Sequence, residues 1–172
     1  MSHTPDVFLP NGTVDRDRFT PAAAEALDQA VGAARATRWD MVKSSHLVMG
    51  VLVAPDATIS LWGLQAGLDR TDIVCRFRDL LRLRGTPKPL ARMHREFMST
   101  PAIVALRTAR ERCDEHDRTR ITPADLLWAL LAQDNWVTTA LTDGGPPSPV
   151  LRVLLADVDR LHSAPSRAPH PR

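Results

Sequence analysis

The chain has 172 residues, of which 44% are hydrophobic and 24% charged, and a formal net charge of +2 at pH 7. This composition is ordinary for one globular domain or two small ones. No apolar run approaches the roughly 18 residues needed to span a bilayer, the start of the chain lacks the pattern of a signal peptide, and two cysteines are too few for a disulfide framework. We therefore expect a cytoplasmic protein without a membrane segment.

The first half of the chain predicts an arm followed by four helices. Residues 1–18 contain turn-forming residues and no helical period, which is typical of a flexible arm. Thr20 and Pro21 then supply a capping residue and a first-turn proline. Apolar residues recur at helical spacing after this start, and again from Ser44 onward, over about 58–66, and from Asp69 or Thr71 through Leu83.

The second half of the chain predicts the same plan after a linker at 85–98, which is rich in helix-breaking residues. Helices are expected from Ser99 or Thr100, from the Thr122-Pro123 cap, over 136–141, and around Val150 to Val158. Residues 163–172 read as a disordered tail. No segment alternates apolar and polar residues as a half-buried strand would, so the sequence predicts an all-α fold.

The two halves are related by an internal repeat. The stretch Ser44–Leu52 corresponds to Pro123–Leu131 at an offset of 123 − 44 = 79 positions, and sliding 20–52 onto 99–131 gives six identities without a gap. The apolar positions of both copies follow one helical period. The pattern predicts two pseudo-symmetric four-helix repeats, eight helices in all, at 19–84 and 99–162.

These repeated residues resemble a known family. Phe19-Thr20, Ala26-Leu27 and Ala30, followed by Val42-x-x-x-His46-Leu47-x-x-x-Val51-Leu52, are similar to the repeat of the N-terminal domain of Clp AAA+ ATPases, and the likeness covers about residues 19–160. The resemblance implies a non-enzymatic domain that recruits substrates and adaptor proteins. No phosphate-binding G-x-x-x-x-G-K-[S/T] loop is present, and we expect the chain to end before any ATPase module.

The resemblance leaves open how such a domain acts without a motor. It would serve as an adaptor, a regulator or a sequestering factor in protein quality control. The expected partners are unfolded or tagged client proteins and a Clp ATPase or its adaptors, and we expect a monomer.

Candidate enzyme and metal residues are few. Ser44, Ser45 and His46 are adjacent, but neighbours on a helix point about 100° apart, so a capping serine and a structural histidine are favoured over a catalytic pair. No two histidines share a helix at i,i+4, and no cysteine pair has zinc-binding spacing. No cofactor or metal is expected.

Two kinds of binding surface are predicted. Phe19 is either a hydrophobic staple beside the first helix cap or part of a surface groove, and with Leu90, Met93 and Phe97 it forms the candidate peptide-binding surface. Some Clp ATPases bind phosphorylated arginine through an acidic residue just before the motif histidine. The matching positions here are Ser45 and Ala124, which lack the carboxylate, so we expect that recognition to be lost.

The segment 76–95 is strongly basic, with seven basic residues against a lone Asp79. Either these residues are the solvated face of the fourth helix, or they hold nucleic acid or an acidic partner. The second alternative makes the chain a small regulatory, nucleic-acid-associated protein whose binding depends steeply on salt. The candidate patch consists of Arg76, Arg82, Arg84, Lys88 and Arg92.

Overall fold

A computed structural model describes residues 6–82, 91–133 and 148–163. These residues form seven α-helices and two short 3-10 helices, with no β-strand among them, so the expected all-α class is confirmed. In chain order the elements are η1 (Arg16–Arg18), α1 (Pro21–Ala36), α2 (Ser44–Val53), α3 (Ala57–Gln65), α4 (Arg70–Leu81), η2 (Arg95–Phe97), α5 (Thr100–Glu115), α6 (Pro123–Leu131) and α8 (Ser148–Ser163).

Most helices begin at side chains that cap them. Thr20 Oγ1 and Ser99 Oγ each accept a hydrogen bond from the backbone amide three residues later, at 3.3 and 3.4 Å. Asp56 and Asp69 cap α3 and α4 in the same way. These contacts satisfy amides of the first turn that have no partner inside the helix. Gly67 follows α3 with φ of +66°, the left-handed conformation that commonly ends a helix.

Several elements of the two halves have matching positions after a shift of 79 residues. α1 and α5 are both 16 residues long and begin at 21 and 100, while α2 and α6 begin at 44 and 123. Two isolated backbone bridges follow the same shift, since Phe19 pairs with Ile121 and Met98 pairs with Val42. Each half thus pairs the residue before its first capped helix with the residue before the other half's second one.

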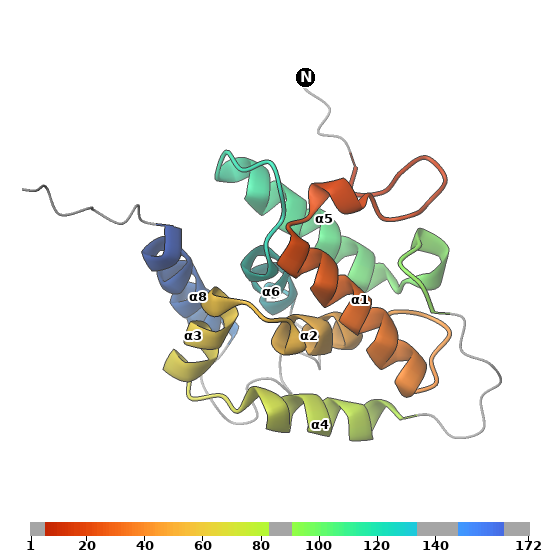
Figure 1. Cartoon of the computed structure of the whole chain (residues 1–172), viewed down its shortest axis with the longest axis horizontal. Coiled ribbons are helices and arrows are strands. Elements are labelled where there is room, and N and C mark those ends of the chain that lie inside the picture. The colour runs from red at the N-terminus through yellow and green to blue at the C-terminus, as the bar shows by residue number, and fades with distance from the viewer. Residues whose placement is uncertain (1–5, 83–90, 134–147, 164–172) are drawn as a thin grey trace, which may run out of the picture.

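Helix α2 lies between α1 and α4 at the centre of the molecule (Figure 1). Nine of its ten residues are buried, from Ser44 to Leu52. Gly50 permits the close approach of α1, because a Cβ atom there would lie 2.2 Å from the Ala26 carbonyl oxygen and 2.8 Å from Ala30 N. The largest fully buried side chains come from both halves: Leu27, Leu47, Ile59, Trp62, Phe77, Leu106, Ile121, Leu126, Leu127, Leu130 and Leu131.

Helix α8 closes the side of the molecule formed by α3 and α6 (Figure 1). Its buried residues are Leu151, Leu155 and Val158, at helical spacing. Trp62 Nε1 of α3 donates a hydrogen bond to the Leu151 carbonyl oxygen at 3.2 Å, so the indole is buried without losing its polar contact.

The expectation of a loose arm before the first helix is wrong for residues 6–18. Val7 and Val14 are almost completely buried, and Val14 N donates a hydrogen bond to the Met93 carbonyl oxygen at 3.1 Å. The arm is ordered because its apolar side chains pack on the segment that leads into η2. This segment lies about 80 residues away in the chain, so local sequence patterns do not reveal the contact.

Other expectations are only partly covered by the described residues. The linker expected at 85–98 is described from residue 91, where it includes η2, and the helix expected at 136–141 lies outside the described ranges. The expected tail at 163–172 also falls outside them, apart from Ser163. Within the described ranges, no single helix is long and apolar enough to cross a membrane. The α2–α3 pair meets the criteria of length and composition only when taken together, and it is bent by 101°.

Candidate functional site

His46 lies in the first turn of α2 and uses both ring nitrogens to hold the local backbone. Its Nδ1 accepts a hydrogen bond from Lys43 N at 3.0 Å, and its Nε2 lies 3.0 Å from Thr37 Oγ1. The Thr37 hydroxyl is 2.8 Å from the Ala33 carbonyl oxygen, to which it donates its only proton. The Nε2–H tautomer of a neutral imidazole therefore satisfies every contact.

The environment of His46 keeps it neutral. Its side chain is fully buried, and burial, followed by the nearby Lys43 ammonium, lowers the pKa of His46 to about 4. Ser45 Oγ is also buried and has no hydrogen-bond partner, so Ser45 and His46 do not form a nucleophile and base. His46 caps the helix, as the sequence favoured.

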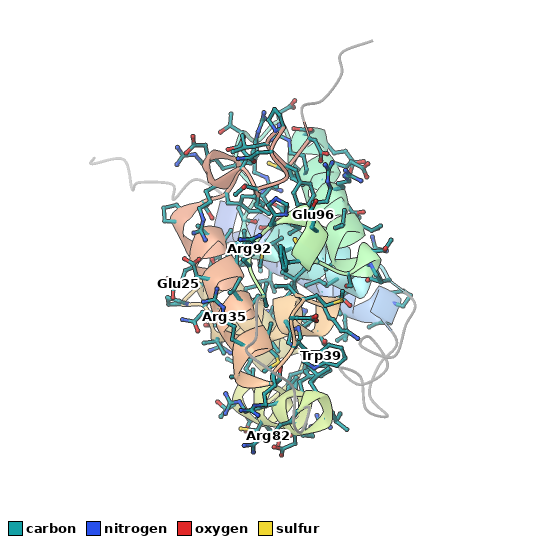
Figure 2. The ribbon with its side chains drawn as sticks, turned by 90° about the vertical axis from the view of Figure 1, so that its right-hand side faces the viewer. Glu25, Arg35, Trp39, Arg82, Arg92 and Glu96 are labelled. Atoms are coloured by element: carbon teal, nitrogen blue, oxygen red, sulfur yellow. The ribbon has the colours of Figure 1, made fainter. Side chains whose placement is uncertain are left out.

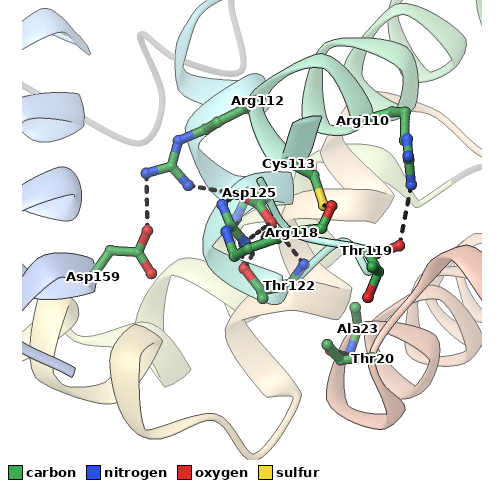
Figure 3. A network of polar contacts seen from close by, with 10 residues as sticks. All are labelled: Thr20, Ala23, Arg110, Arg112, Cys113, Arg118, Thr119, Thr122, Asp125 and Asp159. Atoms are coloured by element: carbon green, nitrogen blue, oxygen red, sulfur yellow. Dashed lines mark hydrogen bonds and ion pairs between the residues drawn. The ribbon is translucent and has the colours of Figure 1, made fainter. Parts of the chain in front are cut away.

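Asp125 has the corresponding place in α6 and accepts the same kind of backbone hydrogen bond (Figure 3). Its Oδ2 accepts from Thr122 N at 2.8 Å. Its carboxylate also pairs with the guanidinium groups of Arg112, at 2.6 Å, and Arg118, at 2.5 Å. Burial alone would raise the pKa of Asp125, but the hydrogen bonds from Arg118 and Thr122 and the positive charge of the two arginines lower it overall.

The Asp125 network connects three helices. Arg112 of α5 is only 3% exposed and also reaches Asp159 of α8 at 3.0 Å. Figure 3 shows Arg112 between the two carboxylates. A buried charge is tolerated only when it is paired in this way. All the charged groups drawn in this network have partners within the protein, so we assign it to the packing of α5, α6 and α8 and not to a ligand.

The two positions that correspond to the phosphoarginine sites, Ser45 and Ala124, are interior. Their exposed fractions are 0% and 2%. Neither presents a polar atom to a ligand in solution. The loss of phosphoarginine recognition stays a prediction, and burial of both positions gives it a second physical reason besides the missing carboxylates.

The expected apolar surface is not assembled as predicted. Phe19 and Met93 are 3% and 8% exposed, so the expectation that they line an open groove is wrong. Phe19 is part of the core at the bridge to Ile121, an interior place like that of the staple alternative. Phe97 is half-buried beneath the Arg92 guanidinium, whose carbon lies 4.2 Å from the ring centre. Leu90 lies outside the described residues.

The described members of the basic segment are dispersed. Arg76 pairs with Asp72 on the same helix at 3.2 Å. Figure 2 shows Arg82 and Arg92 at well-separated heights, with Arg35 and Trp39 between them. Arg84 and Lys88 lie outside the described residues. The described arginines therefore give no observation that favours the nucleic-acid alternative.

A surface pocket lies between the C-terminal end of α2 and one flank of α4. Its volume is about 390 Å³, and it is lined by Leu52, Val53, Arg70, Thr71, Val74, Cys75 and Arg78. We call it the α2–α4 pocket. Leu52 and Val74 are buried at 3% and 6% exposure, whereas Val53 is 50% exposed. The pocket thus combines an apolar floor with two arginines.

Sequence reasoning did not find this pocket. Arg70, Val74 and Arg78 recur every four residues, which places them on one flank of a helix. That spacing was visible in the sequence. It could not show that the end of α2 would face this flank, because the two segments meet only through the tertiary fold.

Among the described residues, no three histidine, cysteine, aspartate or glutamate side chains come together in a group that could hold a metal ion. The two cysteines differ in setting, since Cys75 is exposed in the α2–α4 pocket and Cys113 is buried. Burial raises the pKa of the Cys113 thiol, and the Asp125 carboxylate adds to this effect.

Comparison with known proteins gives a clear likeness of fold. No family model and no curated protein sequence matches the chain. Among solved structures, the Hsp104 N-terminal domain from Candida albicans superposes with a TM-score of 0.65 at 14% identity, covering 82% of this chain and 91% of that one. The N-terminal domain of the ClpD chaperone from Arabidopsis thaliana gives a TM-score of 0.67 at 17% identity, covering 88% and 99%.

A third similar structure is a ClpV N-domain in complex with a VipB peptide. It superposes with a TM-score of 0.62 at 18% identity and covers 90% of this chain and 97% of that one. All three are N-terminal domains of Clp or Hsp104 proteins. The described chain therefore has the fold that the sequence resemblance implies.

Proposed function

We propose that this chain, which has the fold of the N-terminal domains of Clp ATPases, is a non-enzymatic module that binds proteins or peptides. The observation that carries the proposal is the likeness to a ClpV N-domain bound to a VipB peptide, over 90% of this chain. That domain binds a polypeptide segment with the same fold. The role we infer is that of an adaptor, regulator or sequestering factor in protein quality control, acting as a cytoplasmic monomer.

The α2–α4 pocket is our candidate for the contact with a polypeptide. It combines apolar side chains with arginines, and specific binding sites commonly consist of an apolar surface with a few placed polar groups. The Asp125 network and His46 are satisfied inside the fold, so they are not assigned to binding.

We infer that the chain arose as two four-helix repeats. The shared bounds of α1 and α5, the shared starts of α2 and α6, and the exchanged Phe19–Ile121 and Met98–Val42 bridges support this inference. A reciprocal exchange of this kind is what a twofold relation between similar units produces. In this arrangement the α2–α4 pocket belongs to the first repeat.

Binding of unfolded protein tests the proposed function. We expect the fluorescence anisotropy of a labelled, permanently unfolded model protein to rise saturably with this chain, with a dissociation constant below about 100 μM. The native form of the same model protein is the matched control and should not bind. Absence of binding to unfolded proteins, together with no effect on a Clp ATPase or its adaptors, would contradict the proposal.

A further inference from the structure

We propose that the α2–α4 pocket binds an acidic-aliphatic segment of a client polypeptide. One valine, leucine or isoleucine side chain would occupy the apolar hollow, and a nearby aspartate or glutamate carboxylate would pair with Arg78. This inference rests on the proposed function and names the chemistry of the client. The occupant is an internal segment of an unfolded chain.

The floor of the pocket favours an aliphatic side chain. Leu52 and Val74 form buried walls, and Val53, the last residue of α2, remains 50% exposed although it is apolar. Covering such a surface removes apolar area from water, at roughly 25 cal/mol per Å². A volume of about 390 Å³ is at the small end of the range for ligand sites, which suits a side chain and its backbone better than a folded domain.

The charge of the pocket favours a carboxylate. Its lining contains two arginines and no acidic residue. The C-terminal carbonyl groups of α2 face the same region and carry a partial negative charge of roughly half a unit. Arg70 Nη1 donates to one of them, the Leu52 carbonyl oxygen, at 3.3 Å. Two full positive charges exceed half a negative one, so the pocket stays positive.

Arg78 is the arginine placed to meet a ligand. Arg70 is held against α3 and the end of α2, because its Cγ and Cδ would lie only 3.3 Å from a Cβ atom at Gly63 and its Nη1 bonds Leu52. Arg78 is exposed, and the residues three and four positions away on α4 are Val74, Cys75, Leu81 and Arg82, none of them acidic. Its guanidinium therefore has no acidic i,i+3 or i,i+4 neighbour on its own helix.

The acidic residues of α4 are on a different flank from Arg78. At 100° per residue, Asp79 is about 100° and Asp72 about 120° around the helix from Arg78. Asp72 pairs with Arg76 at 3.2 Å. The flank that faces the end of α2 is thus basic, while the acidic residues lie toward solvent on the far side of the helix.

The proposed contacts define a peptide probe. In an extended chain, residues i and i+2 point to the same side and lie about 6.6 Å apart. A carboxylate two positions from the aliphatic anchor can then face the arginine while the anchor fills the hollow. A planar guanidinium matches a carboxylate in charge and shape, which an amide does not.

Cys75 provides a direct readout at the pocket. It is exposed and lines the pocket, whereas Cys113 is buried and its thiol pKa is raised by that burial. Alkylation of the whole chain at neutral pH should therefore modify Cys75 first. The background rate at Cys113 is given by a Cys75→Ser variant. The rate at Cys75, followed by mass spectrometry, reports whether a peptide covers the site.

The experiment compares three acetylated and amidated decapeptides. The first has a central leucine with aspartate and glutamate two positions to either side, the second replaces both acids by their amides, and the third keeps the acids but replaces leucine by serine. We expect the first to slow alkylation at least fivefold at saturation, and the other two to require at least about tenfold higher concentrations. Arg78→Gln should abolish the preference for the acidic over the amide peptide.

Arg120→Gln is the matched control for charge. Arg120 is exposed in the connection between α5 and α6, which lies at the opposite end of the molecule from α4 (Figure 1). This variant has the same change in net charge and should keep the preference. Arg78→Lys should give an intermediate result, because an ammonium keeps the charge but not the two-pronged geometry.

Two results would overturn the inference: equal protection by the acidic and amide peptides, or no protection of Cys75 by the acidic peptide at about 1 mM. The binding of unfolded protein is measured on the same sample. If unfolded protein binds but the acidic peptide gives no preferential protection, the proposed function stands and the pocket assignment fails. If neither binds, both fail.

Discussion

At the residue scale, positions 46 and 125 show how different side chains solve the same problem. Each lies in the first turn of its helix and accepts a hydrogen bond from the backbone amide three residues earlier. His46 does so as a neutral ring, whereas Asp125 does so as a carboxylate that requires two arginines. The two halves of the molecule should therefore respond differently to pH and to loss of charge.

The buried histidine predicts a loss of stability in mild acid. The pKa of His46 is about 4 in the folded chain and near 6.5 when the ring is solvated. As the pH falls below 6.5, the unfolded state takes up a proton before the folded state does, so the free energy of unfolding decreases. Between pH 7 and pH 5 we expect this one site to cost about 2 kcal/mol, measured by urea denaturation at each pH.

The matched control for this prediction is His46→Asn. An asparagine side chain can still accept the hydrogen bond from Lys43 N, but it does not titrate. We expect the variant to be less stable at pH 7 and to lose about 2 kcal/mol less than the parent on going to pH 5. Identical pH dependence in the two proteins would show that His46 is not held neutral by the fold. The carboxylates do not obscure the comparison, since the folded-state pKa of Asp125 lies below its ordinary 3.8.

Charge removal at Asp125 should be costly. Asp125→Asn leaves Arg112, which is 3% exposed, without one of its two carboxylate partners. Breaking a buried pair from one side typically costs about 3–5 kcal/mol. Asp28→Asn removes an acid from an ion pair with Arg16 in which both side chains are 52% exposed, and it should cost less than about 1 kcal/mol. Similar denaturation midpoints for the two variants would contradict the assignment of Asp125 to packing.

At the element scale, the contact between α1 and α2 depends on the absence of a side chain at one position. Gly50→Ala places a Cβ atom 2.2 Å from the backbone carbonyl oxygen of Ala26, so one helix must move. We expect a loss of roughly 1–3 kcal/mol or more in the free energy of unfolding. Gly32→Ala on the outer face of α1 meets no atom within 4 Å, and it should raise stability by about 0.5–1 kcal/mol.

The two glycine substitutions are read together by thermal denaturation. The account requires opposite signs, because the added methyl group and the gain in helix propensity are the same in both. If Gly50→Ala were as stabilising as Gly32→Ala, the close approach of α1 and α2 would be incorrect.

The elements themselves were largely predictable from local signals. Thr20 with Pro21 and Thr122 with Pro123 mark helix starts that the structure has at those places. Helical spacing also identified Phe77, which is 2% exposed, but it included Leu80, which is 69% exposed. Periodicity shows that a helix has an apolar face, but the width of the buried face depends on which helices pack against it.

At the scale of the whole molecule, the misplaced expectations involve contacts between segments distant in sequence. Phe19 was expected at a surface because no nearby helix covers it, yet it is buried at the bridge to Ile121, about 100 residues later. Met93 is buried where residues 6–18 cross the segment before η2. The α2–α4 pocket was missed for the same reason. Sequence patterns describe one element at a time, and a pocket arises where two elements meet.

The central claim is that this Clp N-domain-like fold binds polypeptide segments at the α2–α4 pocket. The most direct test is a titration of the isotope-labelled chain with an unfolded model protein, followed residue by residue through amide NMR shifts. The account predicts saturable changes concentrated at Leu52 and Val53 and along Arg70–Arg78, with little change around Asp125. An absence of residue-specific changes at concentrations up to about 200 μM would contradict it.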